Sequence, residues 1–489
     1  MREFTEPLNV PKFIEMCYKQ HPFAYELNYK KGVAVVGAHF GDCGKGKFDD
    51  LIIRQYKEEG YKVINIRGQG GGNAGHTVVD AETGLKYDFH YLPSGGLVSD
   101  LILLGAGMLL DPIRILKEAE KLPEEQRARI LIDGRATFCT LLERKLDGYY
   151  ESCKEKSGSA KVGSTGSGVG PAVSLRALRV HIQFFKAKAC KNPEELKKLF
   201  DKIPDVPAYI WDDIAEEYGS VMGYIEKLYD AIQQLNIIES MPIIQYTRNM
   251  GWACVLEVSQ AFCLDSLFGN EGNFVTSTHT TVVGALADAG LTPADLTDGT
   301  ILVSKAYASK VGGGPFVTKF SKDDKLEQEI AQYIYDNNGE CGVTTGRIRD
   351  LGWHDCVAIK AAIMRNGSRK LAVNCMDTIG LIPGKHAKIC IAYKHKVTGE
   401  ITSFWPDMQS EYEPVYKEIY TSWNIKHANS EEMIPTEAWR FLAHLEYYSG
   451  AVVTFIGTGG SNADVVRVSD IGRSYIDKWK VKDFGSSAE

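Results

Sequence analysis

The sequence has no long hydrophobic run, and this absence argues against a membrane protein. Its longest apolar stretch, residues 101–110, is interrupted by two glycines and is far short of the ~20 residues that cross a bilayer. Residues 1–31 hold no apolar core of signal-peptide length and no small-residue cleavage site. We therefore expect no membrane partner, and we expect residues 1–31 to be an N-terminal extension docked on the body of the protein.

The sequence also lacks a surplus of positive charge and paired metal-type cysteines. A net charge of -7 gives no reason to expect a nucleic-acid partner, because binding to duplex phosphates calls for a basic face. The eleven cysteines are scattered, and no two form a C-x-x-C pair. This usage is typical of a reducing compartment and argues against a disulfide framework or a zinc site, so we expect a cytoplasmic protein.

What the sequence does have is enough length for a large core. Its 489 residues are 44% hydrophobic and 24% charged, which is ordinary for a globular protein, and they contain no internal repeat or low-complexity tract. The length fits either one large α/β domain with insertions or two to three domains of ~150 residues each.

Residues 33–51 are the most informative stretch, because they combine a short apolar strand, a glycine-rich turn and the start of a helix. The valine-rich run at its start is typical of a buried parallel strand. Lys45 and Lys47 add positive charge to a turn whose backbone can curl its amides toward an anion. The glycines of this turn are Gly37, Gly41, Gly44 and Gly46.

Residues 41–47 satisfy the first part of the phosphate-loop pattern G-x-x-x-x-G-K, but Phe48 stands where a Ser or Thr offers a hydroxyl to magnesium. Asp42 is the obvious substitute, since a carboxylate among phosphates needs a cation between them. The alternative is a strand-to-helix turn that uses glycine only for its geometry. The density of glycine, lysine and aspartate within residues 37–47 favours phosphate binding.

A second glycine-rich segment follows the next strand. The pattern predicts a helix over residues 48–59, a strand over 63–66 and a loop over 67–77. This loop is expected at the same edge of the sheet as the first one, because parallel strands end at a common edge. Its polar groups are Asn73, His76 and Thr77.

The two motifs GDCGKGK and GGGNAGHT resemble those of the adenylosuccinate synthetase family, whose usual versions read GDEGKGK and GGHNAGHT. Further counterparts occur in the family's order and bring the resemblance to about residues 32–468. They are residues 90–95, 163–171, 275–281, 305–307, 311–316 and 344–349.

The resemblance implies a GTP-dependent carbon–nitrogen ligase of purine biosynthesis that joins L-aspartate to inosine monophosphate through a 6-phosphoryl intermediate. Asp42 matches the catalytic aspartate that takes the proton from purine N1 and contacts Mg²⁺, the expected cofactor. His76 matches the histidine that stabilises the transferring phosphoryl group, Lys45 spreads the remaining negative charge, and Gln260 matches a glutamine near the base.

The resemblance also implies a set of nucleotide and phosphate contacts, together with a metal contact from Gly75. These contacts are Gly41, Gly44, Gly46, Lys47, Asn73, Gly75, Thr77, Thr165, Arg176, Thr276, Asp377, Gly457 and Gly459. Either Arg176 or Arg179 matches the arginine that family members contribute across a dimer interface, so a homodimer is expected.

Residues 344–349 are identified by resemblance as the aspartate-binding loop, with Thr344, Thr345, Arg347 and Arg349 as contacts. Two guanidinium groups at a two-residue spacing suit a bidentate grip on a carboxylate. A solvated arginine pair on a turn is the alternative, but the preceding Thr-Thr-Gly supplies donors that such a turn does not require. Ile348 stands where the family commonly has a middle arginine.

The base-recognition segment departs from the family. Asp377 remains, but Cys375 replaces the lysine whose stem packs on guanine. GTP is the leading donor and ATP stays open. Two other functions also remain: a ligase acting on a 2-amino-purine nucleotide such as dGMP, possibly with ATP, and a non-catalytic nucleotide-binding regulator. Asp42 favours inosine chemistry, since dGMP-type relatives tend to lack it.

The fold predicted from these observations is of the α/β class. It has a large, mostly parallel central sheet with a P-loop-like phosphate loop and peripheral helical and loop subdomains. The expected catalytic domain spans residues 32–468, with a peripheral helical segment at 192–240 and a C-terminal tail at 469–489.

Overall fold

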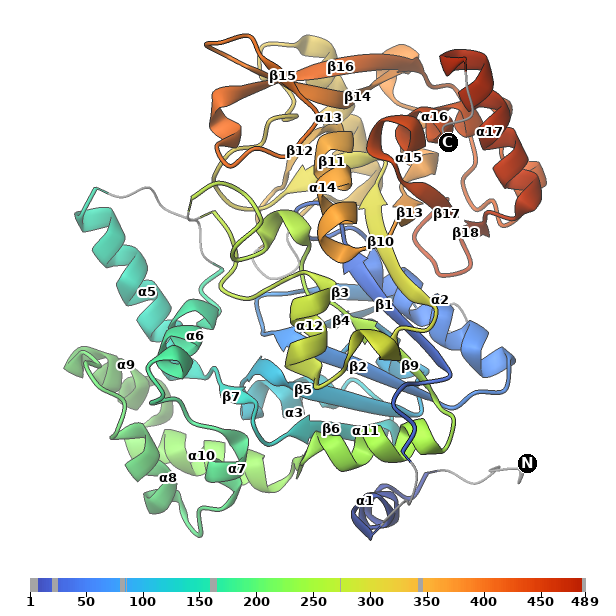
Figure 1. Ribbon diagram of the computed structural model, residues 1–489. Coiled ribbons are helices and arrows are strands. Elements are labelled where there is room, and N and C mark those ends of the chain that lie inside the picture. The colour runs from blue at the N-terminus through green and yellow to red at the C-terminus, as the bar shows by residue number, and fades with distance from the viewer. Residues whose placement is uncertain are drawn as a thin grey trace.

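The computed structural model describes residues 8–19, 25–79, 84, 86–158, 165–272, 274–341 and 346–485. They form a large central sheet, a smaller second sheet and a two-stranded hairpin, with helices packed around them (Figure 1). Within the described ranges the central sheet has eleven strands. These are β1 (Lys31–Gly37), β2 (Val63–Gly70), β5 (Leu101–Leu110), β6 (Ile130–Asp133), β7 (Thr137–Phe138), β8 (Asn236–Ile238), β9 (Ala253–Glu257), β10 (Gly299–Lys305), β13 (Lys370–Asn374), β17 (Val452–Gly457) and β18 (Val465–Arg467).

The strand order is β18-β17-β13-β10-β1-β9-β2-β5-β6-β8, with β7 paired to β5. Only the pairing of β17 with the edge strand β18 is antiparallel among the described pairs of this sheet. The predicted α/β class with a large, mostly parallel central sheet is therefore confirmed.

Strand β1 lies in the middle of the sheet and is buried on both faces. Val33 and Val35 pack on one face with residues of helix α2 (Lys45–Glu58), whereas Ala34 and Val36 belong to the buried core on the other face. This double burial explains why β1 is a continuous apolar run.

The helices of the described residues pack around the sheets. They are α1 (Val10–Lys19), α2 (Lys45–Glu58), α3 (Pro112–Ala119), α4 (Glu124–Arg127), α5 (Leu141–Lys156), α6 (Val169–Ala177), α7 (Phe184–Lys188), α8 (Pro193–Phe200), α9 (Ala208–Tyr218), α10 (Val221–Gln233), α11 (Ser240–Asn249), α12 (Val282–Ala289), α13 (Lys325–Asn338), α14 (Cys356–Asn366), α15 (Met376–Ile379), α16 (Thr436–Ser449) and α17 (Asp470–Phe484).

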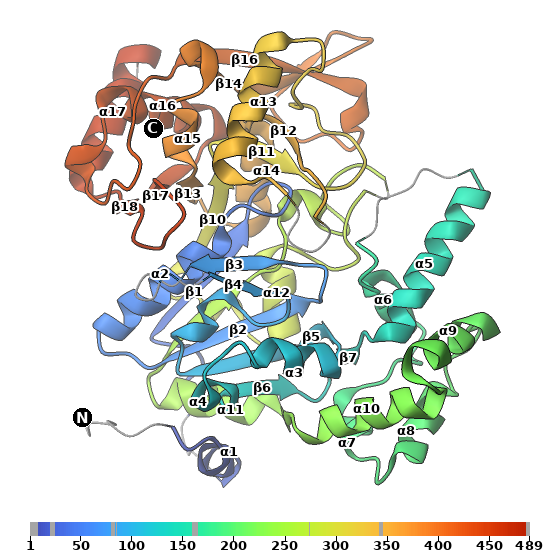
Figure 2. The same cartoon turned by 180° about the vertical axis from the view of Figure 1, so that it is seen from behind.

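Two peripheral layers flank the central sheet. Helices α5 to α10 gather at one end of the molecule, coloured teal to green, and α8, α9 and α10 occupy most of residues 192–240 (Figures 1 and 2). The second sheet lies at the other end and consists of β11 (Tyr307–Lys310), β12 (Asp350–Asp355), β14 (His386–His395), β15 (Ile401–Thr402) and β16 (Tyr412–Tyr420). The hairpin pairs β3 (His76–Val79) with β4 (Lys86–Phe89).

Two element boundaries differ from the sequence expectation. Helix α2 begins at Lys45 and not at residue 48, because Gly44 adopts a left-handed conformation that lets the helix start inside the glycine-rich turn. Helix α6 likewise begins at Val169, directly after left-handed Gly168.

Strand β2 continues to Gly70, although residues 67–70 were expected in a loop. The glycines of this segment serve close packing: a Cβ on Gly68 would lie 2.5 Å from the Ala285 carbonyl oxygen of α12. Glycine here marks a close approach of helix and strand and not a turn.

Helix α17 occupies the segment expected to be a tail. It is joined to α16 through Glu446, which is 2% exposed and whose carboxylate lies 2.6 Å from Arg473 Nη1 and 2.5 Å from Lys480 Nζ. Glu446 also accepts a hydrogen bond from Val453 N at the start of β17. In the described ranges, no helix is long and apolar enough to cross a membrane.

We expect Glu446→Gln to lower the free energy of unfolding by about 3 kcal/mol, because it leaves Arg473 and Lys480 without their buried counter-charge. Urea unfolding and the protease sensitivity of α17 measure this change. Asp477→Asn is the matched control, since Asp477 is an exposed partner of the same Lys480 at 3.4 Å. A Glu446→Gln variant as stable as Asp477→Asn would show that this carboxylate does not anchor α17.

Candidate active site

The predicted site residues that follow β1, β13 and β17 lie at one edge of the central sheet. The parallel strands β1, β9, β10, β13 and β17 all run toward this edge, and the predicted phosphate loop, residues 37–47, follows β1 directly. The carboxyl edge of a parallel sheet is where ligands bind in open α/β proteins. Side chains far apart in sequence therefore meet there.

The phosphate loop is held in one conformation by a neighbouring strand end. Gly41 and Gly44 have φ values of 131° and 78°, which side chains rarely adopt. The Asn374 side chain donates from Nδ2 to the Cys43 carbonyl oxygen at 2.7 Å, and a Cβ on Gly44 would lie 2.4 Å from the same nitrogen. Gly46 lies in the first turn of α2. The N-terminus of α2 thus faces the loop, as in anion sites at helix N-termini.

Lys45 is buried and points back across the loop. Its ammonium group donates to the Gly41 carbonyl oxygen at 3.2 Å and to the Gln260 carbonyl oxygen at 2.5 Å. Gln260 itself has a φ of 63°, and its Oε1 atom is buried without a hydrogen-bond partner among the described residues. The loops after β1 and β9 are therefore joined by the predicted catalytic lysine.

Unpartnered polar atoms also line the carboxyl end of β2. Within the described residues, Arg67 Nη2, Gln69 Oε1 and Asn73 Oδ1 are buried without a hydrogen-bond partner. Arg67 is otherwise fixed, because Nε donates to Ser259 Oγ at 2.8 Å and Nη1 donates to the His90 carbonyl oxygen at 2.6 Å. Buried polar groups of this kind usually have partners, so their concentration here marks a binding region.

Sequence reasoning missed Arg67 and Gln69. The signal was the alternation of polar residues at 65, 67 and 69 within an otherwise apolar strand, which was read as the beginning of a loop. In the structure these side chains belong to a buried strand.

Asp42 belongs to a cluster of four charges. Its Oδ2 atom lies 2.7 Å from Arg349 Nη2 and 3.9 Å from Lys305 Nζ. Glu340, which is 1% exposed, bonds both cations: Oε1 lies 2.6 Å from Lys305 Nζ and Oε2 lies 2.8 Å from Arg349 Nη1. The structure thus brings together the predicted catalytic aspartate and one predicted aspartate-binding arginine.

The pKa shifts in this cluster reflect mutual stabilisation. Burial raises the pKa of Glu340, but Lys305 and Arg349 outweigh it and the net pKa is lowered. Burial lowers the pKa of Lys305 and of Arg349, yet the neighbouring carboxylates leave both pKa values raised. All three groups are therefore charged near neutral pH. Lys305 and Glu340 were not among the predicted site residues, although Lys305 lies in a motif shared with the family.

Lys47 points to the predicted base pocket. Its ammonium group donates to the Gly459 carbonyl oxygen at 2.9 Å. Burial lowers the pKa of Lys47, and the proximity of Asp377 and Cys375 opposes this shift. A Cβ on Gly457 would lie 2.1 Å from Asn374 Oδ1 and 3.0 Å from Asn374 Cα, so the close approach of the two strand ends favours glycine there. The phosphate loop, the end of β13 and the loop after β17 therefore meet at this lysine.

Cys375 and Asp377 lie at the beginning of the short helix α15. Cys375 is the left-handed residue before it, with φ of 60°, and burial raises the pKa of its thiol to about 12. Burial also raises the pKa of Asp377, while Lys47 is among the groups that lower it. A neutral thiol thus occupies the position at which the family's lysine is expected.

The remaining predicted residues are placed as follows. Thr276 N donates to the Leu264 carbonyl oxygen at 2.9 Å, and Leu264 packs beneath Gly41. Thr165 Oγ1 donates to Ser167 Oγ at 2.9 Å, and Arg176 Nη1 on α6 donates to the Gly107 carbonyl oxygen at 3.3 Å. The last two contacts lie within the neighbourhood of α6 and do not join these residues to the phosphate loop.

Six further predicted residues fall in or beside the hairpin or at the predicted aspartate loop. Gly75 precedes β3, and the backbone of His76 and Thr77 pairs with Phe89 and Asp88 of β4. Arg347 is exposed. Thr344 and Thr345 lie outside the described residues.

The donor set at Asp42 fits a magnesium ion that is shared with a nucleotide. Magnesium is usually held by one or two carboxylates together with phosphate oxygens and waters. Asp42 supplies such a carboxylate, its side chain is 41% exposed, and it projects from the phosphate loop. No group of three or more His, Cys, Asp or Glu residues with metal-site geometry occurs among the described residues, so a protein-only metal cage is absent there.

Two buried histidines lie behind the phosphate loop. His39 Nε2 is 3.2 Å from the Asp355 carbonyl oxygen, and His354 Nδ1 is 2.9 Å from the Lys305 carbonyl oxygen. Their ring centroids are 5.2 Å apart. Burial lowers the pKa of His39 to about 4, and burial together with His39 lowers the pKa of His354 to about 3. Both rings are therefore neutral at pH 7.

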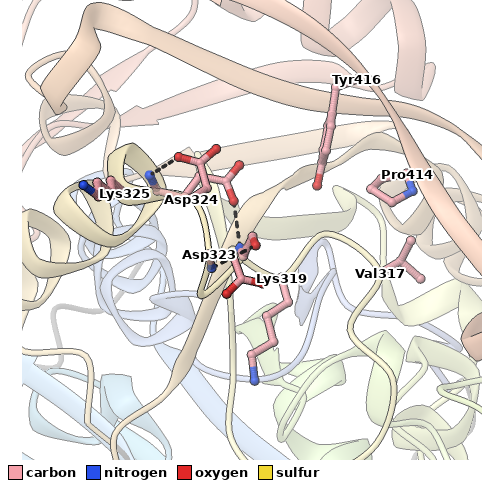
Figure 3. A pocket seen from close by; sticks show the side chains of 9 residues that line it. Val317, Lys319, Asp323, Asp324, Lys325, Pro414 and Tyr416 are labelled. Carbon is pink, nitrogen blue, oxygen red and sulfur yellow. Dashed lines mark hydrogen bonds between the residues drawn. The ribbon is translucent and has the colours of Figure 1, made fainter.

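An open groove of about 730 Å³ lies outside this cluster, and none of the predicted site residues lines it (Figure 3). Two of its charged groups have partners within the protein: Lys319 Nζ lies 2.7 Å from Asp350, and Asp324 caps α13 by accepting from Leu326 N. The lining residues are Val317, Lys319, Ser321, Asp323, Asp324, Lys325, Glu327, Pro414 and Tyr416.

Comparison with known proteins agrees with the geometry. The family model described as adenylosuccinate synthetase matches residues 34–466. The adenylosuccinate synthetase of Caldicellulosiruptor bescii is 31% identical over 448 residues, covering 88% of this chain and 98% of that protein. A solved structure of fully ligated adenylosuccinate synthetase from Plasmodium falciparum matches with a TM-score of 0.78 at 27% identity, covering 89% of this chain and 99% of that one.

A more distant likeness extends to the fold alone. The structure of cyanophage S-2L succinoaminodeoxyadenylate synthetase, bound to dGMP and dATP as an energy donor, matches with a TM-score of 0.54 at 17% identity. It covers 92% of this chain and 100% of that one.

The two buried histidines make stability depend on pH. Because the folded pKa of His39 is lower than its ordinary value of 6.5, the unfolded chain takes up protons first as the pH falls. This contribution is intact above about pH 6.5 and declines progressively toward pH 4. We expect His39→Gln, which keeps a donor for the Asp355 carbonyl but cannot be protonated, to remove roughly 2 kcal/mol of the stability difference between pH 7 and pH 5.

Urea unfolding at both pH values measures this difference. Burial raises the pKa of Asp355 to about 6, so Asp355 changes stability in the opposite direction over part of the range from pH 7 to pH 5. This contribution is present in both the wild type and His39→Gln. His386→Gln, at an exposed histidine of β14, is the matched control and should leave the pH dependence unchanged. Equal pH dependence of His39→Gln and the wild type would contradict the prediction.

Proposed function

The chain belongs to the adenylosuccinate synthetase family, and from this premise we propose that it joins L-aspartate to inosine monophosphate with hydrolysis of GTP. The family identifies it as a carbon–nitrogen ligase that acts on nucleotides. The identity of the purine substrate, of the triphosphate and of the residues that carry each step is our proposal.

The first proposed step activates the purine. Asp42 accepts the proton from N1 of inosine monophosphate, and the 6-oxygen attacks the γ-phosphorus of GTP. The bond between the γ-phosphorus and the bridging oxygen breaks, and GDP leaves. Lys45, Lys47 and the loop amides stabilise the charge that develops on the phosphoryl group, together with His76.

The second proposed step forms the carbon–nitrogen bond. The neutral amine of aspartate attacks C6, the bond between C6 and its oxygen breaks, and inorganic phosphate leaves with that oxygen. The proton that the amine loses passes to the departing phosphate. Arg347 and Arg349, with Thr344 and Thr345, hold the carboxylates of aspartate during the attack. A bound Mg²⁺, held by Asp42, the Gly75 carbonyl and phosphate oxygens, would neutralise charge on the phosphates.

One observation carries the proposal: the 2.7 Å contact between Arg349 Nη2 and Asp42 Oδ2. A base for the purine and a guanidinium group suited to a carboxylate are far apart in sequence, and the fold brings them into direct contact. Their contact supports a reaction in which a purine and an amino acid meet at Asp42. We also propose a homodimer in which Arg176 or Arg179 reaches the partner's nucleotide.

The direct test is phosphate release by the purified protein with inosine monophosphate, GTP, aspartate and Mg²⁺. We expect turnover that requires all three substrates. Asp42→Asn and His76→Asn should each cost about 3 to 5 kcal/mol of transition-state stabilisation while the fold is retained, because each removes a group that acts on the phosphoryl transfer. Near-wild-type turnover by either variant would refute the mechanism. Turnover with dGMP in place of inosine monophosphate would assign the acceptor to the alternative class.

The triphosphate is proposed to be GTP because of Asp377. A carboxylate accepts hydrogen bonds from N1–H and the 2-amino group of guanine, whereas adenine presents no donor at N1 and would leave the carboxylate unpaired. Cys375 lacks the aliphatic stem that would cover the base. Weaker binding of GTP, without a gain for ATP, is the expected consequence.

We expect Cys375→Lys to tighten GTP binding by roughly 1 kcal/mol, since the lysine stem adds apolar contact over the base. Cys375→Met is a matched control. It adds a stem of comparable length but places no second positive charge close to Lys47. Michaelis constants for GTP and ATP in the three proteins measure the effect. Faster wild-type turnover with ATP than with GTP at equal concentration would mean that the base pocket selects adenine.

A further inference from the structure

We propose that Glu340 is a positioning residue that holds Lys305 and Arg349 against Asp42 and closes the base of the aspartate loop. The inference rests on the proposed function, since it concerns how the amino acid and the purine base share one site. Glu340 touches neither substrate in this proposal. It acts through the two cations that it binds.

The Glu340 carboxylate divides its two oxygens between different elements. Oε1 accepts from Lys305 Nζ of β10 at 2.6 Å and from the Tyr307 hydroxyl, whereas Oε2 accepts from Arg349 Nη1 at 2.8 Å. Each cation then turns a remaining face to Asp42, at 3.9 Å from Lys305 and 2.7 Å from Arg349. The orientation of both cations toward Asp42 is thus set from behind by one carboxylate.

Burial makes this arrangement depend on the charge of Glu340. Glu340 is 1% exposed, and the side chains of Lys305 and Arg349 are 10% and 6% exposed. Two carboxylates balance two cations in the cluster. Without the charge of Glu340, the two poorly hydrated cations would share Asp42 as their remaining anionic partner in this cluster. Loss of the Glu340 charge is therefore expected to be costly, because it breaks a buried charge pair.

The backbone of Glu340 adds a second role. Its carbonyl oxygen accepts from Arg349 N at 3.0 Å, and Cys341 pairs with Ile348 in an isolated bridge. Residues 340–341 and 348–349 are therefore the two stems of the predicted aspartate loop. Both the side chain and the main chain of Glu340 fix Arg349, the last residue of this loop.

The same network reaches the segment that carries Asp377. Asn338 at the end of α13 donates to the Tyr307 hydroxyl at 2.7 Å and accepts from Thr378 Oγ1 at 3.1 Å. Thr378 follows Asp377 in α15. Glu340 thus lies where connections from the phosphate loop, the aspartate loop and the base segment converge.

The test is Glu340→Gln, which keeps the size of the side chain but removes its charge and replaces one of its two acceptor oxygens by a donor group. The matched control is Glu327→Gln. Glu327 is a buried carboxylate on α13 that also has several partners, with Trp353 Nε1 at 2.7 Å, Ser321 N at 2.7 Å and Lys388 Nζ at 3.0 Å. Glu327 has no contact with Asp42 or Arg349 among the described residues. The Glu327→Gln variant therefore shows the general effect of losing a buried charge near this sheet.

We expect Glu340→Gln to raise the Michaelis constant for aspartate at least tenfold while those for the two nucleotides change less than about twofold. We also expect kcat to fall, because Lys305 and Arg349 are no longer held toward Asp42 by a carboxylate on their other side. Glu327→Gln should not change the ratio of the Michaelis constants. Equal changes in all three constants would overturn the proposal.

A second readout does not depend on turnover. Trypsin cleavage after Arg347 should be several-fold faster in Glu340→Gln than in the wild type or Glu327→Gln, because the loop stems lose their side-chain tie. Adding Lys305→Gln to Glu340→Gln restores the charge balance, and it should restore protease resistance without restoring kcat. Unchanged cleavage in the single variant would remove the structural half of the proposal.

These readouts separate the inference from the proposed function. If the wild type does not use inosine monophosphate but turns over another purine nucleotide, the same comparison is made with that nucleotide and the inference stands or fails on the aspartate constant. If no nucleotide supports turnover, the proposed function fails, and trypsin cleavage alone decides whether Glu340 fixes the loop.

Discussion

The position of β1 between β10 and β9 is the constraint on which the site depends. Both neighbours run parallel to β1, and both faces of the strand are buried, so its interior carries no polar side chain. Polar side chains that could bind a ligand or take part in a reaction are therefore restricted to the ends of the strands. At Gly37 the packing is so close that a Cβ would lie 2.5 Å from the Gln260 carbonyl oxygen. The phosphate loop and the loop after β9 are consequently held at a fixed separation before any ligand is considered.

The second requirement is that each buried charge of the site has a counter-charge. This requirement explains why the site includes residues that lie outside the sequence motifs. A buried lysine or arginine needs an internal anion, because the interior cannot hydrate it. Glu340 supplies that anion for Lys305 and Arg349, although it lies outside the segments that resemble phosphate or aspartate loops. The residues that make a charged site tolerable in the folded protein are thus different from those that contact its ligands.

The fold class could be predicted from the sequence because apolar strands followed by glycine-rich turns have few other interpretations. The strand at the start of residues 33–51 was found by its continuous hydrophobicity, which double burial imposes. The end of β2 was misread because its glycines serve helix packing at Gly68, a contact between segments more than two hundred residues apart. Asn374 and Glu340 could not be assigned roles for the same reason: their partners, Cys43 and Lys305, are adjacent only in the folded chain.

The resting contacts of the cations bear on how anions enter such a site. Lys45 and Lys47 are each bonded to main-chain carbonyl oxygens, which are neutral acceptors. A phosphate that replaces a carbonyl exchanges a weaker hydrogen bond for a charge-assisted one, so the exchange is favourable. Arg349 differs, because its partners Asp42 and Glu340 are already carboxylates. An anion that reaches Arg349 replaces one carboxylate by another, and its net gain is only the difference between two similar interactions. The strength with which Arg349 binds an anion therefore depends on which partner Asp42 has once it is displaced. The Arg349 guanidinium group thus links the predicted aspartate loop to the phosphate loop.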